Sequence, residues 1–128
     1  VLDASALLAY LDGGPGCETV TRALESAAES GQNLLISAVN WGEVCYVLVR
    51  KFGQVRAEQI IAVIDTLPVE VDPAGRELAR QAALFKAHRK LPYADSFAAA
   101  LAKIRRAELL TADKEFKIVE KEIRILWI

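Results

Sequence analysis

Four acidic side chains of this chain lie in or beside strongly apolar segments, where an ionised carboxylate is least stable. Asp3 occurs in VLDASALLAYL, Glu43 in ISAVNWGEVCYVLV, Asp95 in LPYADSFAAALA and Asp113 in ELLTADKEF. An unpaired carboxylate in apolar surroundings is energetically costly, unless a cation pairs with it or it takes up a proton. A chain that repeats this arrangement either pairs these acids with cations or uses them in chemistry.

Each of these acids also has a purely structural explanation. Asp3 and Asp113 each stand between a predicted strand and a predicted helix, where an Asp commonly caps the helix N-terminus. Asp95 falls in a first helical turn, where the helix dipole favours an acid. Glu43 lies well inside an apolar helix, so its structural alternative is a buried ion pair. One shared site explains the four acids together better than four separate explanations do.

The composition is that of one folded domain. The 128 residues are 53% hydrophobic and 26% charged, which is well outside the range of disordered chains. The net charge of −1 and the pI near 5.9 exclude a global basic field, so a polyanionic partner must be held locally. The chain contains no apolar run long enough to span a membrane and no signal-peptide pattern. Cys17 and Cys45 have no metal-binding spacing and are expected to be reduced, which favours a cytoplasmic protein.

Strand and helix patterns alternate along the chain without a repeat or a long linker. Apolar strands are predicted at Val1–Leu2, Asn33–Ser37, Val69–Asp72, Glu108–Thr111 and Ile123–Ile128. Helices are predicted at Ser5–Leu11, Glu18–Glu29, Val39–Phe52, Arg56–Leu67, Pro73–His88, Pro92–Arg106 and Lys114–Lys121. This alternation predicts a single three-layer α/β/α domain over residues 1–128, with a central parallel sheet of four to five strands covered by helices on both faces.

The predicted architecture also places the acids. Ligands of open α/β sheets bind beyond the carboxyl ends of the strands, where the strand order reverses. Asp3 and Asp113 each follow a strand, so we expect both at this edge. Glu43 shares a stripe of period four with apolar residues, and Asp95 shares one with alanines, which predicts that both acids face inward.

Other catalytic arrangements have little support. His88 is the only histidine, which excludes a metal-free mechanism with two histidines, and no nucleophile-elbow serine motif is present. The stretch Gly13–Gly16 lacks the Lys and the Ser or Thr of a P-loop, so we interpret it as a turn. A receiver domain is disfavoured, because it needs a Lys at the end of its fifth strand and the last predicted strand, RILWI, has none.

The acids and their neighbours together resemble a known family. The motif DAS at Asp3, a Ser six positions before Glu43, YADS around Asp95 with its alanine-rich continuation, and LTADKEF around Asp113 resemble PIN-domain ribonucleases. The likeness is greatest to the VapC-type toxins of toxin–antitoxin pairs, and it covers the whole chain with the acids in the same order. One departure is the start at Val1, where the family has further residues that complete the first strand.

The resemblance implies a metal site and a function. The implied catalytic residues and metal ligands are Asp3, Glu43, Asp95 and Asp113, with Ser5 and Thr111 as neighbouring hydroxyls. Oxygen ligands select hard cations, so the cofactor would be Mg²⁺ or Mn²⁺, as one ion or two. The implied activity is that of a metal-dependent endoribonuclease acting on RNA, the toxin that a small antitoxin protein inhibits. The alternative is a PIN-like module that binds RNA or a protein without cutting.

Contacts to the substrate and to a partner are less defined. Arg89, Lys90 and Lys114 flank the acidic motifs and are suited to hold phosphates, although charges at helix ends also serve solubility. Trp41 and Tyr93 adjoin the acids, and each is suited either to stack a base or to pack in the core. The predicted helices at 39–52 and 56–67 carry more apolar surface than one core needs, which is consistent with a homodimer or a partner groove.

Overall fold

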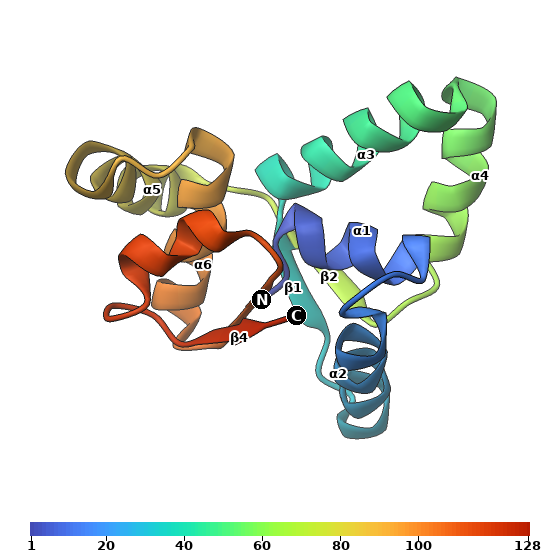
Figure 1. Cartoon of the computed structure of the whole chain (residues 1–128), viewed down its shortest axis with the longest axis horizontal. Helices are drawn as coiled ribbons and strands as arrows, with labels where there is room; N and C mark the ends of the chain where they lie inside the picture. Colours follow the sequence, from blue (N-terminus) through green and yellow to red (C-terminus); the bar gives the residue numbers. More distant parts are fainter.

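The structure, a computed structural model, describes residues 1–128 as short strands alternating with helices (Figure 1). The strands are β1 (Leu34–Ser37), β2 (Val69–Asp72), β3 (Leu109–Thr111) and β4 (Ile125–Trp127). The helices are α1 (Ala4–Asp12), α2 (Cys17–Ser30), α3 (Ala38–Phe52), α4 (Gln54–Ile64), α5 (Arg76–Arg89), α6 (Tyr93–Arg105) and the 3₁₀ helix η1 (Lys114–Val119).

The predicted first strand is reduced to Leu2, which lies at the centre of the sheet. Leu2 forms single parallel bridges to β1 and β3, while β1 pairs in parallel with β2 and β3 with β4. The register places Ser37 beside Asp72 and Thr111 beside Trp127. The spatial order is therefore β2, β1, Leu2, β3, β4, with the reversal of strand order at Leu2. The predicted parallel pairing is confirmed, with the two bridges of Leu2 in place of a full first strand.

Helices cover both faces of this sheet, as the alternating pattern predicts. One buried cluster joins α5, α6 and η1 to the sheet, and a second joins α1, α2, α3 and α4 to it. Leu109 belongs to the first cluster and the adjacent Leu110 to the second, because successive side chains of a strand point to opposite faces. The α6 residues from Asp95 to Ala102 are all buried, and the alanines among them let this helix pack closely against its neighbours.

Two predicted helix boundaries are wrong. The helix expected from Pro73 begins only at α5, because Ala74 adopts a left-handed backbone with φ 56° and donates its N–H to the Asp72 carboxylate at 3.0 Å. The helix expected to reach Leu67 ends with α4 at Ile64, because the N–H groups of Thr66 and Leu67 donate to carbonyls only three residues back, in tight turns that lead to Pro68. Both differences arise from turn chemistry at the ends of β2.

The structure agrees with two further expectations from the sequence. Cys17 and Cys45 are both free thiols. Gly13 ends α1 in a left-handed conformation, so the glycine-rich stretch is a turn.

No helix combines the length and the apolar character that crossing a bilayer requires.

The C-terminal end of α6 provides a test of backbone strain. Arg106 caps this helix with φ 52°, a conformation that costs a side-chain-bearing residue about 1–2 kcal/mol and costs glycine little. We expect Arg106→Gly to raise the free energy of unfolding by only roughly 0.5–1 kcal/mol in urea denaturation, because the larger chain entropy that glycine loses on folding offsets part of the relieved strain. Arg80→Gly, in the interior of α5, is the control and should lower it by about 1 kcal/mol. A destabilised Arg106→Gly would contradict the assignment of strain.

Candidate active site

Asp3 lies at the point where the strand order reverses, directly after Leu2 and before α1. Its side chain is buried, and its Oδ1 accepts the backbone N–H of Ala6 at 2.9 Å, so it caps α1. The Ser5 hydroxyl also donates to the carboxylate at 2.9 Å, and the Thr111 hydroxyl does so at 2.8 Å. Three separate donors therefore fix the orientation of this carboxylate.

The same two hydroxyls connect Asp3 to the segment after β3. The Oγ of Ser5 accepts the N–H of Ala112 at 2.9 Å, and the Oγ1 of Thr111 accepts the N–H of Asp113 at 2.9 Å. Asp113 in turn caps η1 by accepting a backbone N–H of its first turn. Ser5 and Thr111 thus tie the residues at two adjacent strand ends to each other.

Asp95 and Glu43 are placed by helices and differ from the other two acids in their contacts. Asp95 is only 9% exposed in the first turn of α6, and Glu43 is half-buried in α3. Neither carboxylate accepts a hydrogen bond from the protein, and neither forms one of its ion pairs. The fully inward stripe of α3 is Asn40, Val44 and Leu48, so Glu43 lies beside this stripe and not on it, one position away from the expected place.

The four acids act on one another through their charges. Burial, with a smaller contribution from the charge of Asp113, raises the pKa of Asp3 to about 6 against the hydrogen bonds that lower it. Burial, followed by the charges of Asp113, Asp3, Glu43 and Glu115, raises the pKa of Asp95 to about 7. Burial and Asp113 also raise the pKa of Glu43. The structure therefore brings the four predicted residues into one electrostatic cluster that contains no paired cation.

The spacing of this cluster differs from that of a complete metal cage. No group of three or more His, Cys, Asp or Glu side chains is arranged so that it could hold a metal ion. The donor chemistry nevertheless fits a hard divalent cation, because all of the donors are carboxylate oxygens. A cation would also offset the charge repulsion that adds to burial in raising the pKa of Asp95. The residues fit Mg²⁺ or Mn²⁺ in kind, and their side chains would have to approach one another to bind it.

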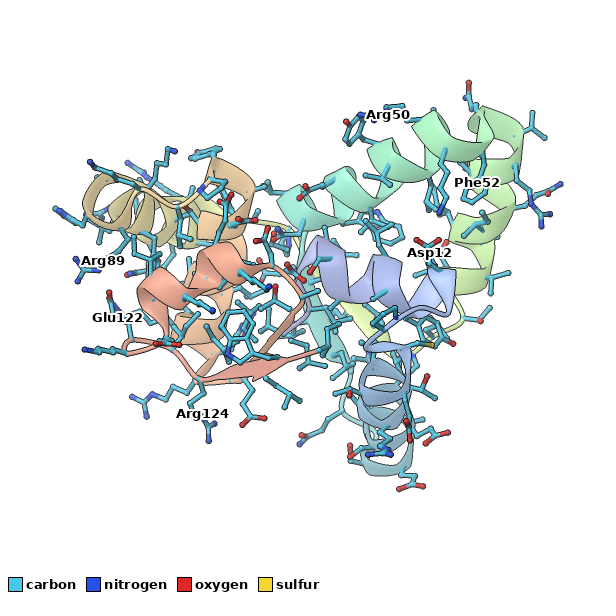
Figure 2. All side chains as sticks on the ribbon, viewed as in Figure 1. Asp12, Arg50, Phe52, Arg89, Glu122 and Arg124 are labelled. Atoms are coloured by element: carbon cyan, nitrogen blue, oxygen red, sulfur yellow. The ribbon has the colours of Figure 1, made fainter.

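Side-chain oxygens gather at the centre of Figure 2, where α3 meets α1 and α6. Of the cations expected near this region, Arg89 is engaged by an ion pair with Glu122, and both are labelled in the figure. Lys90 and Lys114 are exposed and form no ion pair. His88 is exposed in the last turn of α5, as expected of a solvated residue at a helix end. Lys90 and Lys114 are therefore the cations left free for a ligand.

The two aromatic residues beside the acids have different environments. Tyr93 is 56% exposed, and its ring packs edge-on against Phe97 with the centroids 5.1 Å apart. Trp41 packs against the buried cluster beneath α1, α2, α3 and α4. Trp41 therefore packs in the core, which is one of the two roles considered for it. The ring of Tyr93 remains accessible to solvent.

One residue outside the predicted set connects the helices that carry Glu43 and Asp95. Asn40, fully buried in the first turn of α3, donates its side-chain amide to the backbone carbonyl of Ala94 at 3.1 Å. Ala94 directly precedes Asp95. The available signal in the sequence was an amide side chain at an inward position, three residues after the Ser that caps the helix.

Comparison with known proteins identifies the fold family. The family model of the PIN domain matches residues 1–122. This chain belongs to the PIN domain family. No curated protein sequence is significantly similar to it.

Three solved structures resemble this PIN domain along most of its length. VapBC2 from Rickettsia felis, bound to a DNA fragment from its promoter, has 14% identity and a TM-score of 0.76, and the match covers 98% of this chain and 95% of that chain. A toxin–antitoxin complex from Klebsiella pneumoniae has 21% identity and a TM-score of 0.62, with 90% and 88% covered. VapC20 from Mycobacterium tuberculosis, a Sarcin-Ricin loop cleaving toxin, has 21% identity and a TM-score of 0.66, with 91% of each chain covered. At these identities the likeness establishes the fold, which confirms the predicted PIN-like α/β architecture.

Asp95→Asn tests whether this carboxylate is unpaired in the folded PIN domain. The folded protein raises the pKa of Asp95 from 3.8 to about 7, so ionisation of this group opposes folding. The stability that the folded state gains from holding Asp95 protonated is complete below pH 3.8 and is lost as the pH rises through about 7. In EDTA, Asp95→Asn should therefore be more stable than the parent at about pH 8 and should depend less on pH, as measured by urea denaturation.

Glu29→Gln, an exposed change in α2, is the matched control and should leave both the stability and its pH dependence unchanged. If Asp95 instead pairs with a buried cation, Asp95→Asn should lose roughly 3–5 kcal/mol at neutral pH. A loss of that size would exclude Asp95 as an unpaired, ligand-ready carboxylate.

Proposed function

We propose that this PIN domain, spanning residues 1–128, is a metal-dependent endoribonuclease that hydrolyses RNA, and that it is the toxin of a toxin–antitoxin pair. The observation that carries the proposal is the cluster of four carboxylates at the reversal of strand order, with no protein cation paired to them. Membership of the PIN family and the toxins among the similar structures support it. The competing function is a PIN-like module that binds RNA or a protein without cutting.

Two of the four proposed ligands accept hydrogen bonds from the protein, and the other two do not. Asp3 and Asp113 are fixed by hydrogen bonds at adjacent strand ends. Asp95 and Glu43 have no such donors, so their side chains are free to adjust around an ion. When bound, Mg²⁺ or Mn²⁺ lowers the pKa of a water molecule and neutralises charge at the phosphodiester. Glu43, half-buried in α3, is suited to orient the attacking water or to accept its proton.

The substrate proposal rests on the groups that remain free around the acids. Of the three cations expected to flank the acids, Lys90 and Lys114 form no ion pair, and we assign them to phosphate contacts. Tyr93 stands two positions before Asp95 with an exposed ring held against Phe97, which suits stacking with an unpaired base. This combination favours single-stranded RNA, whose bases are open to stacking. The overall charge of −1 makes such local contacts necessary.

Removal of divalent cations tests the enzymatic proposal. We expect the protein to cut single-stranded RNA in Mg²⁺ or Mn²⁺, to lose cleavage in excess EDTA and to regain it when Mn²⁺ is restored. Asp95→Asn should lose activity by orders of magnitude, while Glu29→Gln should retain it. Because the ion binds only the folded state, it should also stabilise the parent by about 2.7 kcal/mol at a hundredfold excess over Kd. Undiminished cleavage in EDTA would refute the mechanism, and RNA binding without cleavage in either ion would favour the non-cutting module.

The exposed apolar face of α3 and α4 supports a protein partner. Its large apolar side chains are Tyr46, Val49, Phe52, Val55 and Val63. Exposed large apolar side chains that gather on two packed helices commonly mark an interaction surface. We propose that it binds a small antitoxin, which places a basic side chain near the carboxylate cluster. Arginine suits this role, because its forked guanidinium can pair with clustered carboxylates at two points. A homodimer through the same face is the competing occupant.

Expression in a host cell tests the partner. The chain alone should arrest growth, and co-expression with its genomic neighbour should restore growth and yield a complex of the two proteins. Val55→Asp places a charge on the apolar face, at a side chain 78% exposed, and should remain toxic because binding of the neighbour is lost. Leu84→Asp, at a side chain 51% exposed on α5, is the control and should still be rescued. No toxicity of the chain alone would exclude the toxin role while leaving the nuclease activity open to its own test.

A further inference from the structure

The side chain of Asn40 is completely buried, and hydrogen bonds hold it at both ends. Its Oδ1 accepts the hydroxyl of Ser37, and its Nδ2 donates to the backbone carbonyl of Ala94 at 3.1 Å. Its own backbone N–H donates to the Oγ of Ser37 at 3.1 Å. Every side-chain polar atom of the protein that is completely shielded from solvent has a hydrogen-bond partner. Asn40 is thus locked between the end of β1 and the beginning of α6.

Capping of α3 does not require this amide. Ser37 already caps the helix by accepting the N–H of Asn40. In a capping box a Glu or Gln at this third helical position bends back to the backbone of the cap residue. The shorter Asn40 side chain instead accepts the cap hydroxyl and directs its NH₂ group across to α6. A buried amide is more costly than an apolar residue unless its hydrogen bonds are made, so its purpose must be sought in the contact to Ala94.

This contact joins the two helices that carry the carboxylates without hydrogen-bond donors, Glu43 and Asp95. It is the only side-chain hydrogen bond between α3 and α6. Glu43 follows Asn40 by three positions, on a neighbouring part of the helix surface, and Asp95 directly follows Ala94. The hydrogen bond therefore ties the start of α3, which carries Glu43, to the start of α6, which carries Asp95.

We propose that Asn40 is a positioning residue of the candidate metal site, which sets the separation of Glu43 and Asp95 so that both carboxylates reach one divalent cation. This inference rests on the proposed function. Asn40 does not itself contact the ion or the RNA. Groups that orient metal ligands in this indirect way typically change metal affinity by about 10–100-fold when they are removed.

Mn²⁺ affinity of the full chain without RNA, measured by electron paramagnetic resonance, tests this role. Asn40→Ala should raise the Kd for Mn²⁺ by about 10–100-fold and should speed amide hydrogen exchange in the first turn of α6. It should lower kcat for RNA at saturating Mn²⁺ while leaving KM unchanged, because the RNA-binding residues are untouched. Val20→Ala, a fully buried truncation in α2, is the control for lost stability and should leave the Mn²⁺ affinity as it is in the parent.

The measurements are made at a temperature where every variant is folded. Asn40→Leu, which fills a similar volume without a hydrogen-bond donor, replaces Asn40→Ala if the latter does not fold. Parental Mn²⁺ affinity and parental kcat in a folded Asn40 variant would overturn this inference while leaving the nuclease proposal in place. A parent that neither binds Mn²⁺ nor cuts RNA would overturn the proposed function, and the metal-positioning role with it.

Discussion

The buried carboxylate of Asp3 is the interaction on which the arrangement of the site depends. A charge that is only 3% exposed must find donors, and Asp3 finds them in the backbone of α1 and in the hydroxyls of Ser5 and Thr111. Those hydroxyls accept N–H groups of the segment that follows β3. One continuous set of hydrogen bonds therefore fixes the start of α1, the end of β3 and the position of Asp113. Because Leu2 lies where the strand order reverses, this set forms at the edge where α/β folds bind ligands.

The other half of the cluster obeys a different constraint. Asp95 and Glu43 receive no hydrogen bonds, and burial together with neighbouring charge makes their ionised forms costly. A domain selected only for stability would neutralise such groups with a cation or replace them with apolar residues. Their retention, unpaired and beside two rigidly held aspartates, is the arrangement expected of groups that act on a ligand. Asp3 and Asp113 can cap a helix and also bind a ligand, because a cap uses only part of the acceptor capacity of a carboxylate.

The sequence predicts the features that depend on neighbouring residues better than those that depend on contacts between residues far apart in the chain. The strand Val69–Asp72 was predicted with its observed bounds, because prolines limit it on both sides. The clustering of the four acids was predictable from apolar surroundings and from their places at strand and helix ends. The left-handed Ala74 was not, because it depends on a hydrogen bond to the preceding Asp rather than on any residue preference. The contact of Asn40 with Ala94 spans 54 positions and has no local pattern at all.

The geometry of α3 links the candidate site to the proposed partner surface. This helix runs from the centre of the molecule, where Asn40 and Glu43 lie, to its periphery, where it meets α4 (Figure 1). The exposed apolar face and the carboxylate cluster thus occupy two ends of one rigid element. A partner that displaces α3 would strain the hydrogen bond to Ala94 and alter the separation of Glu43 and Asp95. Partner binding and metal binding would then be coupled through α3 even without direct competition for the carboxylates, and thermodynamic reciprocity requires each to weaken the other equally.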